Sequence, residues 1–339
     1  MNALLFLAIF AAHEPAWAVP APDPEELLSS ALETPATAFE GRMMVTHWFG
    51  RQARAEEVEV YYSPPNLTRR EYLDPDGGVV RVVISDGEKE EVLLVRENKV
   101  LKGDAVKKYD KLMSAEREKE LLLKNYRLSV LKEDKVAGRA AWVLELKPLL
   151  PGKPLQRLWV DQQTRVILEN KRFLPKKSFA ALSRFSRFEP KKELDEKLFT
   201  LDLASRTAVA EQDLEPDFLS LEELGQATGK AVPFPPELPG GFAFESADFF
   251  TVNKRLVRQA RYTDGLAVVS LFATDRPVRL PKTGTFAVAA PTSGKGAKTL
   301  RFSSSGEVLS WKRGHLHYTM MGDLSRELMA RIASRINPR

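Results

Sequence analysis

The stretch Asn125 to Phe173, NYRLSVLKEDKVAGRAAWVLELKPLLPGKPLQRLWVDQQTRVILENKRF, decides the fold class. Apolar residues recur at every second position in four successive runs, which begin at Tyr126, Trp142, Leu158 and Val166. A period of two predicts strands that each have one apolar face and one wetter face. Gly, Pro and polar residues separate the runs and are typical of turns. We therefore expect an antiparallel meander of four strands.

The same pattern continues upstream of this stretch, over residues 39–101. Five short alternating segments are separated by turn-forming sequences such as Asp74-Pro75-Asp76-Gly77-Gly78. In one of these segments Val58, Val60 and Tyr62 alternate with mostly charged neighbours, as in a sheet that packs on one side only. The N-terminal half is thus predicted to be one long antiparallel sheet built from hairpins.

Two helices are predicted beside this sheet. Asp23 with Pro24 and two following glutamates forms a capping-box arrangement, which predicts a helix to about Glu33. Its apolar stripe could cover an open sheet face or bind a partner. Ser114 can cap a second helix over about 115–124, placed to close the mouth of a curled sheet.

A second domain is predicted downstream, because 339 residues are comfortable for two ordinary domains. Residues 205–231 carry few strand signals and are expected to be a linker, and a segment dense in Pro and Gly from Pro233 to Gly241 opens the domain. Seven short strands are expected between Phe242 and Met320. A final helix follows, in which an apolar residue recurs at every fourth position and is expected to be buried: Leu324, Leu328, Ile332 and Ile336.

Two short motifs give the chain a family resemblance. Leu158-Trp159-Val160-Asp161, followed by a turn and a returning strand, resembles the lipoprotein-carrier-like half-barrel of bacterial periplasmic proteins. His317-Tyr318-Thr319-Met320-Met321-Gly322-Asp323-Leu324 before a helix resembles the C-terminal domain of the MucB/RseB family of periplasmic sigma-factor regulators. The expected fold is α+β: an N-terminal antiparallel half-barrel (19–204) with covering helices, and a smaller C-terminal antiparallel sheet (232–339) with one C-terminal helix.

The first 18 residues are expected to be a secretory signal peptide. Residues 3–12 form an apolar run too short to cross a bilayer of about 30 Å, and Ala16-Trp17-Ala18 fits a cleavage site. This run lacks the usual preceding Lys or Arg, so the true start could lie upstream; the alternative is a buried helix of the mature fold. The expected location of the mature chain is the periplasm.

Charge is distributed unevenly along the chain, whose formal net charge is +5. Residues 232–339 carry 16 Lys and Arg against 8 Asp and Glu, a net charge of +8. A basic domain favours acidic partners, such as an acidic protein segment or anionic lipid headgroups. The candidate partner-binding residues are Arg255, Arg258, Arg261, Arg276 and Arg279; the other interpretation of each is an ordinary surface charge.

Residues 171–192 also combine eight cations with four phenylalanines. This mixture could bind single-stranded nucleic acid, but export of the protein argues against a nucleic-acid partner. We expect a strand with inward phenylalanines and solvated cations; contact with anionic lipid or a partner is the alternative.

A curled half-barrel with an apolar lining could enclose a ligand such as an acyl chain. The other interpretation is that each lining residue simply packs the core. The residues assigned to the apolar cavity are Val58, Val60, Tyr62, Tyr126, Leu128, Trp142, Leu144, Leu158 and Val160.

No catalytic or metal site is predicted, and no cofactor is expected. The chain has no cysteine and no hydrolase, metalloprotease or phosphate-binding motif, although an acid pair built across strands stays open. His315 and His317 are expected on one face of a strand, but no third ligand lies nearby in sequence.

The resemblance implies a function that composition does not. In the MucB/RseB family the protein binds the periplasmic segment of a membrane-spanning anti-sigma factor and shields it from proteolysis, and lipid or lipopolysaccharide relieves that shielding in the envelope stress response. The expected function is therefore a non-enzymatic regulator, with a homo-oligomer left open. The alternatives are a lipid or lipoprotein carrier and a structural module of the envelope.

Overall fold

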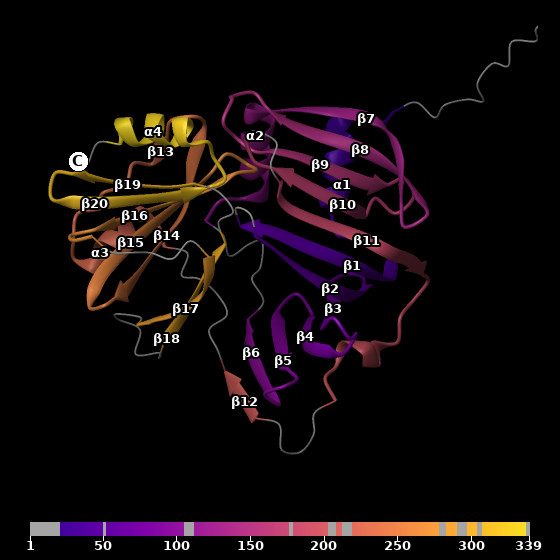
Figure 1. Ribbon diagram of the computed structural model, residues 1–339. Coiled ribbons are helices and arrows are strands. Elements are labelled where there is room, and N and C mark those ends of the chain that lie inside the picture. Colours follow the sequence, from indigo (N-terminus) through magenta and orange to yellow (C-terminus); the bar gives the residue numbers. More distant parts are fainter. Residues whose placement is uncertain are drawn as a thin grey trace, which may run out of the picture.

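The computed structural model describes residues 21–49, 52–104, 112–175, 179–202, 208–211, 219–277, 283–289, 297–303 and 307–336. Within these ranges the chain forms two β-sheets and four α-helices (Figure 1). The fold is α+β, with an N-terminal curled sheet and a smaller C-terminal sheet, as the sequence predicts. The signal peptide predicted at 1–18 lies outside the described residues.

The larger sheet has twelve strands in the order β12-β6-β5-β4-β3-β2-β1-β11-β10-β9-β8-β7. Consecutive strands of the chain are mostly neighbours, which is the meander expected from the hairpin signals. Its strands are β1 (Ala38–Phe49), β2 (Gln52–Ser63), β3 (Leu67–Leu73), β4 (Val79–Ser85), β5 (Lys89–Leu94), β6 (Lys99–Asp104), β7 (Tyr126–Val136), β8 (Arg139–Pro148), β9 (Leu155–Asp161), β10 (Ile167–Phe173), β11 (Phe179–Lys191) and β12 (Ala208–Glu211).

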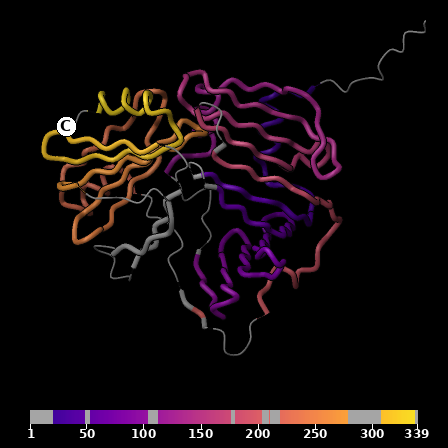
Figure 2. The backbone as a smooth tube through the Cα atoms, in the orientation of Figure 1, coloured from indigo at the N-terminus to yellow at the C-terminus, as the bar shows by residue number. Residues whose placement is uncertain are grey.

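The smaller sheet has the strand order β18-β17-β14-β15-β16-β20-β19, and β13 pairs with β14. Figure 2 shows it beside the part of the large sheet formed by β7 to β10. Its strands are β13 (Glu237–Leu238), β14 (Phe242–Val252), β15 (Arg255–Thr263), β16 (Val268–Thr274), β17 (Thr283–Ala289), β18 (Ala297–Ser303), β19 (Glu307–Arg313) and β20 (Leu316–Gly322).

The helices begin where capping residues predict. Asp23 caps α1 (Pro24–Leu32), Ser114 caps α2 (Ala115–Asn125), and their side chains accept hydrogen bonds from backbone N–H groups of the first turn. Ser325 caps α4 (Arg326–Arg335), whose Leu328 and Ile332 are buried against the smaller sheet. The capping box of α3 (Leu221–Thr228) pairs Ser220 with Glu223.

The segment 205–231, expected to be a linker, contains secondary structure in its described parts. It holds β12 and α3, and Leu224 of α3 is fully buried in the core of the smaller sheet. The Pro-rich segment that follows also packs on this sheet, because Tyr262 donates its hydroxyl hydrogen to the Pro235 carbonyl at 2.7 Å. Residues 219–241 therefore belong to the C-terminal unit.

Candidate functional site

The residues assigned to the apolar cavity do not share one face of the large sheet. Every residue of β8 from Ala141 to Leu146 is buried, so this strand is covered on both sides. Trp142 packs in a cluster with α1 and α2, whereas its neighbour Val143 packs in a second cluster on the other face. An alternating pattern of apolar residues cannot distinguish the two faces of a strand that is buried on both.

The helix-covered cluster holds most of the predicted cavity residues. Leu27 and Leu28 of α1 and Leu122 of α2 cover it. The predicted residues in this cluster are Tyr126, Leu128, Trp142, Leu144, Leu158 and Val160. They pack against helices, so they form core here.

The opposite face carries an aromatic cluster that includes Val60 and Tyr62. Phe39 stacks on Tyr62 with ring centroids 5.2 Å apart, and Phe188 lies 4.9 Å from Phe39. The Tyr62 hydroxyl donates to nearby backbone carbonyls at 2.9 Å. Val58 is also buried. The curled sheet is thus packed with side chains at this end, as a small barrel is.

Accessible apolar surface remains farther along the same face, over β3 to β6. Cross-strand register places Val60 in one row with Arg70, Val83, Val92 and Leu101. Val92 and Leu101 are only half-buried, and Arg70 is exposed. Side chains in one row share a face of the sheet. We call Arg70, Val83, Val92 and Leu101 the β3–β6 row. Val83 is buried, whereas Val92 and Leu101 keep part of their surface accessible, and the sequence-based cavity assignment did not include these four residues.

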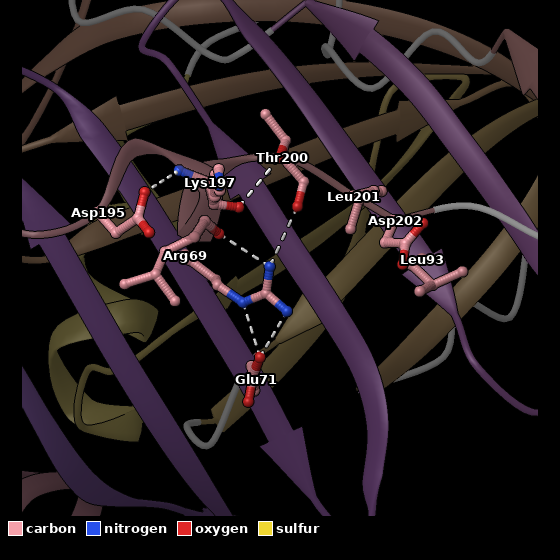
Figure 3. Close-up of a pocket in the computed structure, with 9 residues that line it drawn as sticks. Arg69, Glu71, Leu93, Asp195, Lys197, Thr200, Leu201 and Asp202 are labelled. Atoms are coloured by element: carbon pink, nitrogen blue, oxygen red, sulfur yellow. Dashed lines mark hydrogen bonds and ion pairs between the residues drawn. The ribbon is translucent and has the colours of Figure 1, made fainter.

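A pocket of about 440 Å³ lies on the other side of the same strands (Figure 3). Its outer wall is the segment 194–201, which we call the strap and which includes the short helix η2 (Glu196–Phe199). Phe199 anchors the strap by packing in a cluster with Val82 and Ile84. The pocket is lined by Arg69, Glu71, Leu93, Asp195, Lys197, Leu198, Thr200, Leu201 and Asp202.

Arg69 of β3 holds the strap through hydrogen bonds. Its guanidinium donates to the carbonyl oxygens of Leu198 at 2.8 Å and Thr200 at 3.4 Å, and to the Glu71 carboxylate at 2.7 Å. Figure 3 shows these bonds converging on one guanidinium. Since the charge of Arg69 is matched by Glu71 and its donors point at carbonyls, its role here is to hold the strap.

A buried polar network joins the two sheets. The Lys153 ammonium lies 2.8 Å from the Asp264 carboxylate, and both side chains are fully buried. Tyr126 donates to the same carboxylate at 3.1 Å, and Lys153 donates to Asn125 at 2.9 Å. Asn125 in turn donates to the carbonyl of Gly241 at 3.2 Å. We call Lys153, Asp264, Tyr126 and Asn125 the junction network.

The backbone at this junction is closely packed as well. Gly265 has φ +94°, and an added Cβ would lie 2.3 Å from the backbone nitrogen of Leu122 in α2. Burial, followed by the nearby Asp264 charge, raises the pKa of the Tyr126 hydroxyl, so this group stays protonated as a donor. The junction therefore combines a glycine-dependent close approach with a matched pair of charges.

The candidate arginines of the C-terminal half occupy different environments. Arg258 is wrong as a docking residue, because it is buried and donates to the Ala231 carbonyl at 2.7 Å. Burial lowers its pKa. Arg261 lies 3.5 Å from the buried Glu245 carboxylate. Arg255 donates to the Pro277 carbonyl, Arg276 is exposed, and Arg279 lies outside the described residues.

The two histidines do not share a strand. His317 is in β20, whereas His315 lies in the turn between β19 and β20.

The inward phenylalanines expected in 171–192 are confirmed at Phe185 and Phe188, both buried in the aromatic cluster.

The chain shares its fold with MucB. It aligns with MucB in complex with MucA(peri) over 94% of this chain and 99% of that chain, with 17% identity and a TM-score of 0.56. The MucA/MucB complex from Pseudomonas aeruginosa gives the same coverage and identity and a TM-score of 0.57. No family model and no curated protein matches the chain.

Proposed function

We propose that this protein, which has the fold of MucB, binds the extracytoplasmic segment of a membrane-spanning anti-sigma factor. The observation that carries this proposal is the alignment with MucB in its MucA complexes, which spans 94% of this chain and includes both sheets. The proposed role is regulatory and non-enzymatic. It agrees with the family resemblance of the two sequence motifs around Trp159 and Tyr318.

Shielding of the bound segment from proteolysis follows physically from such binding. A protease must take up its substrate as an accessible extended chain, and a segment whose backbone and side chains are held on another protein is withdrawn from it. The net charge of +8 in residues 232–339 would attract an acidic segment and speed its association. Arg276 is exposed for such contact.

We further propose that lipid or lipopolysaccharide binds on the β3–β6 row and relieves this shielding. Val92 and Leu101 offer apolar surface there, and Arg70 lies in the same row as a cation for an anionic headgroup. Each methylene of an acyl chain that leaves water contributes about 0.8 kcal/mol. Affinity for such a ligand can therefore come from apolar contact with few hydrogen bonds.

The proposed location is the periplasm, after removal of residues 1–18. None of the helices in the described ranges is long and apolar enough to span a bilayer. The proposed export depends on the apolar run of residues 3–12 and the Ala16-Trp17-Ala18 sequence. The N-terminal sequence of the protein purified from the periplasm would test this proposal: it should begin at Val19.

A pull-down tests the main proposal. Purified mature protein is incubated with detergent extracts of inner membrane, and the captured proteins are identified by mass spectrometry. We expect to recover a single-pass anti-sigma factor. We also expect its purified extracytoplasmic segment to resist cleavage by the protease that acts on it when this protein is added. If no such factor is recovered, the proposed regulatory function is wrong.

The β3–β6 row favours a second candidate function, a carrier of lipid or lipoprotein. The same pull-down separates the two, since a carrier would recover acylated proteins or lipid alone. A structural module of the envelope would recover neither.

A further inference from the structure

The edge of the large sheet at β6 has an unusual neighbour. β12 pairs with β6 in parallel, from Ala208 opposite Lys99 to Glu211 opposite Lys102. Every other strand pair described in this sheet is antiparallel. β12 follows the strap in the chain, so it adds to the edge from a connecting segment and not from a hairpin (Figure 1).

The pairing of β12 is weak by several physical measures. It contains only four residues, whereas β6 has six. Parallel pairing is slightly less stable per residue than antiparallel pairing. Val209 is 53% exposed, so it leaves much of its apolar surface in water. A longer antiparallel strand at this edge would make more hydrogen bonds and bury more surface.

Without β12, the edge of β6 would present unpaired N–H and C=O groups. Such an edge is a ready template for an extended chain, and proteins bind peptides in this way by strand addition. The neighbouring strand β5 pairs with β6 along its whole length, from Lys89 opposite Asp104 to Leu94 opposite Lys99. The template is therefore regular and already held in the sheet.

The charges of β6 indicate which kind of strand would fit. Its cations are Lys99 and Lys102 and its one acid is the terminal Asp104, so the strand carries a net positive charge; Lys102 lies 2.5 Å from the Glu91 carboxylate of β5. The segment that now covers the edge reads Ala-Val-Ala-Glu, small apolar residues followed by an acid placed opposite Lys102. An acidic strand with small or β-branched apolar residues would complement this edge.

From these observations we propose that the β6 edge docks an extended, acidic segment of the protein's partner, and that β12 occupies this edge until the partner displaces it. This inference rests on the proposed function and locates part of its binding surface. It assigns β12 the role of an internal competitor. Binding then exchanges a four-residue parallel pairing for a longer one.

A reversible disulfide tests the exchange. The natural chain has no cysteine, so Lys99→Cys with Ala208→Cys, which are register partners, introduces a single bond between β6 and β12. The probe is the purified extracytoplasmic segment of the anti-sigma factor recovered in the pull-down, and affinity is measured by titration calorimetry. We expect the oxidised variant to bind at least ten-fold more weakly than its reduced form.

Two controls make the result specific. Lys312→Cys with His317→Cys joins register partners of β19 and β20, far from β6, and its oxidation should leave affinity unchanged. Val209→Pro removes a backbone donor from β12 and should raise affinity several-fold by weakening the competitor. Equal binding by the oxidised and reduced Lys99 and Ala208 variant overturns the edge proposal alone. Failure to recover any anti-sigma segment overturns the proposed function, and this inference with it.

Discussion

Replacing Lys153 by Ala should destabilise the protein far more than replacing an exposed lysine. The Lys153 and Asp264 side chains are both fully buried, so the variant leaves a carboxylate in a dry site without its counter-charge. Removing one partner of a buried ion pair costs about 3–5 kcal/mol of unfolding free energy. Asp264 keeps hydrogen bonds from Tyr126 and from the backbone N–H of Ala267. We therefore expect Lys153→Ala to lower the free energy of unfolding by about 3 kcal/mol, the low end of this range.

Lys230 provides the matched control. Its ammonium lies 2.5 Å from Asp275, but the two side chains are 44% and 49% exposed. Solvent and salt screen such a pair, so Lys230→Ala should cost less than about 1 kcal/mol. Both variants remove the same side chain from an ion pair of similar length, and they differ mainly in burial.

Urea unfolding followed by tryptophan fluorescence and circular dichroism measures both costs. With a slope of about 3 kcal/mol per M, a loss of about 3 kcal/mol lowers the midpoint of Lys153→Ala by about 1 M. The double variant Lys153→Met with Asp264→Asn should lose less than Lys153→Ala, because no unpaired charge remains. If Lys153→Ala lost no more stability than Lys230→Ala, the junction network could not have the strength assigned to it.

Three further outcomes are expected. Gly265→Ala should lower stability by about 2 kcal/mol or more, because the new Cβ meets the backbone of α2, whereas Gly138→Ala, also at positive φ but in open space, should lose about 1 kcal/mol in the same urea assay. The hydrogen bond from Trp159 lowers the pKa of Asp134 to about 2; its stabilisation is therefore present above the unfolded pKa near 4 and is lost as pH falls toward 2, and Asp134→Asn should flatten the acid unfolding curve in that window. Affinity for the anti-sigma segment should fall steeply between low and physiological salt, and a calorimetric titration independent of salt would contradict a basic docking surface.

Local sequence signals predicted the elements of this fold well, because the signals are physical properties of the elements themselves. The caps at Asp23 and Ser114 set the starts of α1 and α2. The stripe that includes Leu324 and Ile336 is buried against the smaller sheet. Each of these depends on residues a few positions apart, which a sequence displays directly.

The residues assigned to the cavity are divided between two faces of the sheet, because burial here depends on the curl of the sheet. Residues 142 and 143 both look apolar, and nothing local tells which faces the helices and which faces the aromatic cluster. A continuous apolar run, as in β8, was the available signal that both faces are covered.

The junction and the parallel strand lay beyond any local signal. Thr263-Asp264-Gly265 reads as a tight turn, and the structure does place a turn after β15. However, Asp264 is buried, and its counter-charge is Lys153, more than a hundred residues earlier in the chain. β12 is similar: Ala-Val-Ala-Glu has no strand signature of its own, and its partner strand β6 lies more than a hundred residues earlier in the chain.

The unequal strength of these contacts bears on how a partner could change the molecule. Moving the two sheets apart would expose Lys153 and Asp264 and separate Gly265 from α2. The junction network and the close packing therefore both oppose this movement. Releasing β12 breaks only a short parallel pairing, with Val209 already half exposed. A ligand shifts an equilibrium by no more than its differential affinity for the two states. The less costly change is therefore the exchange of β12 at the edge, with the two sheets held in place.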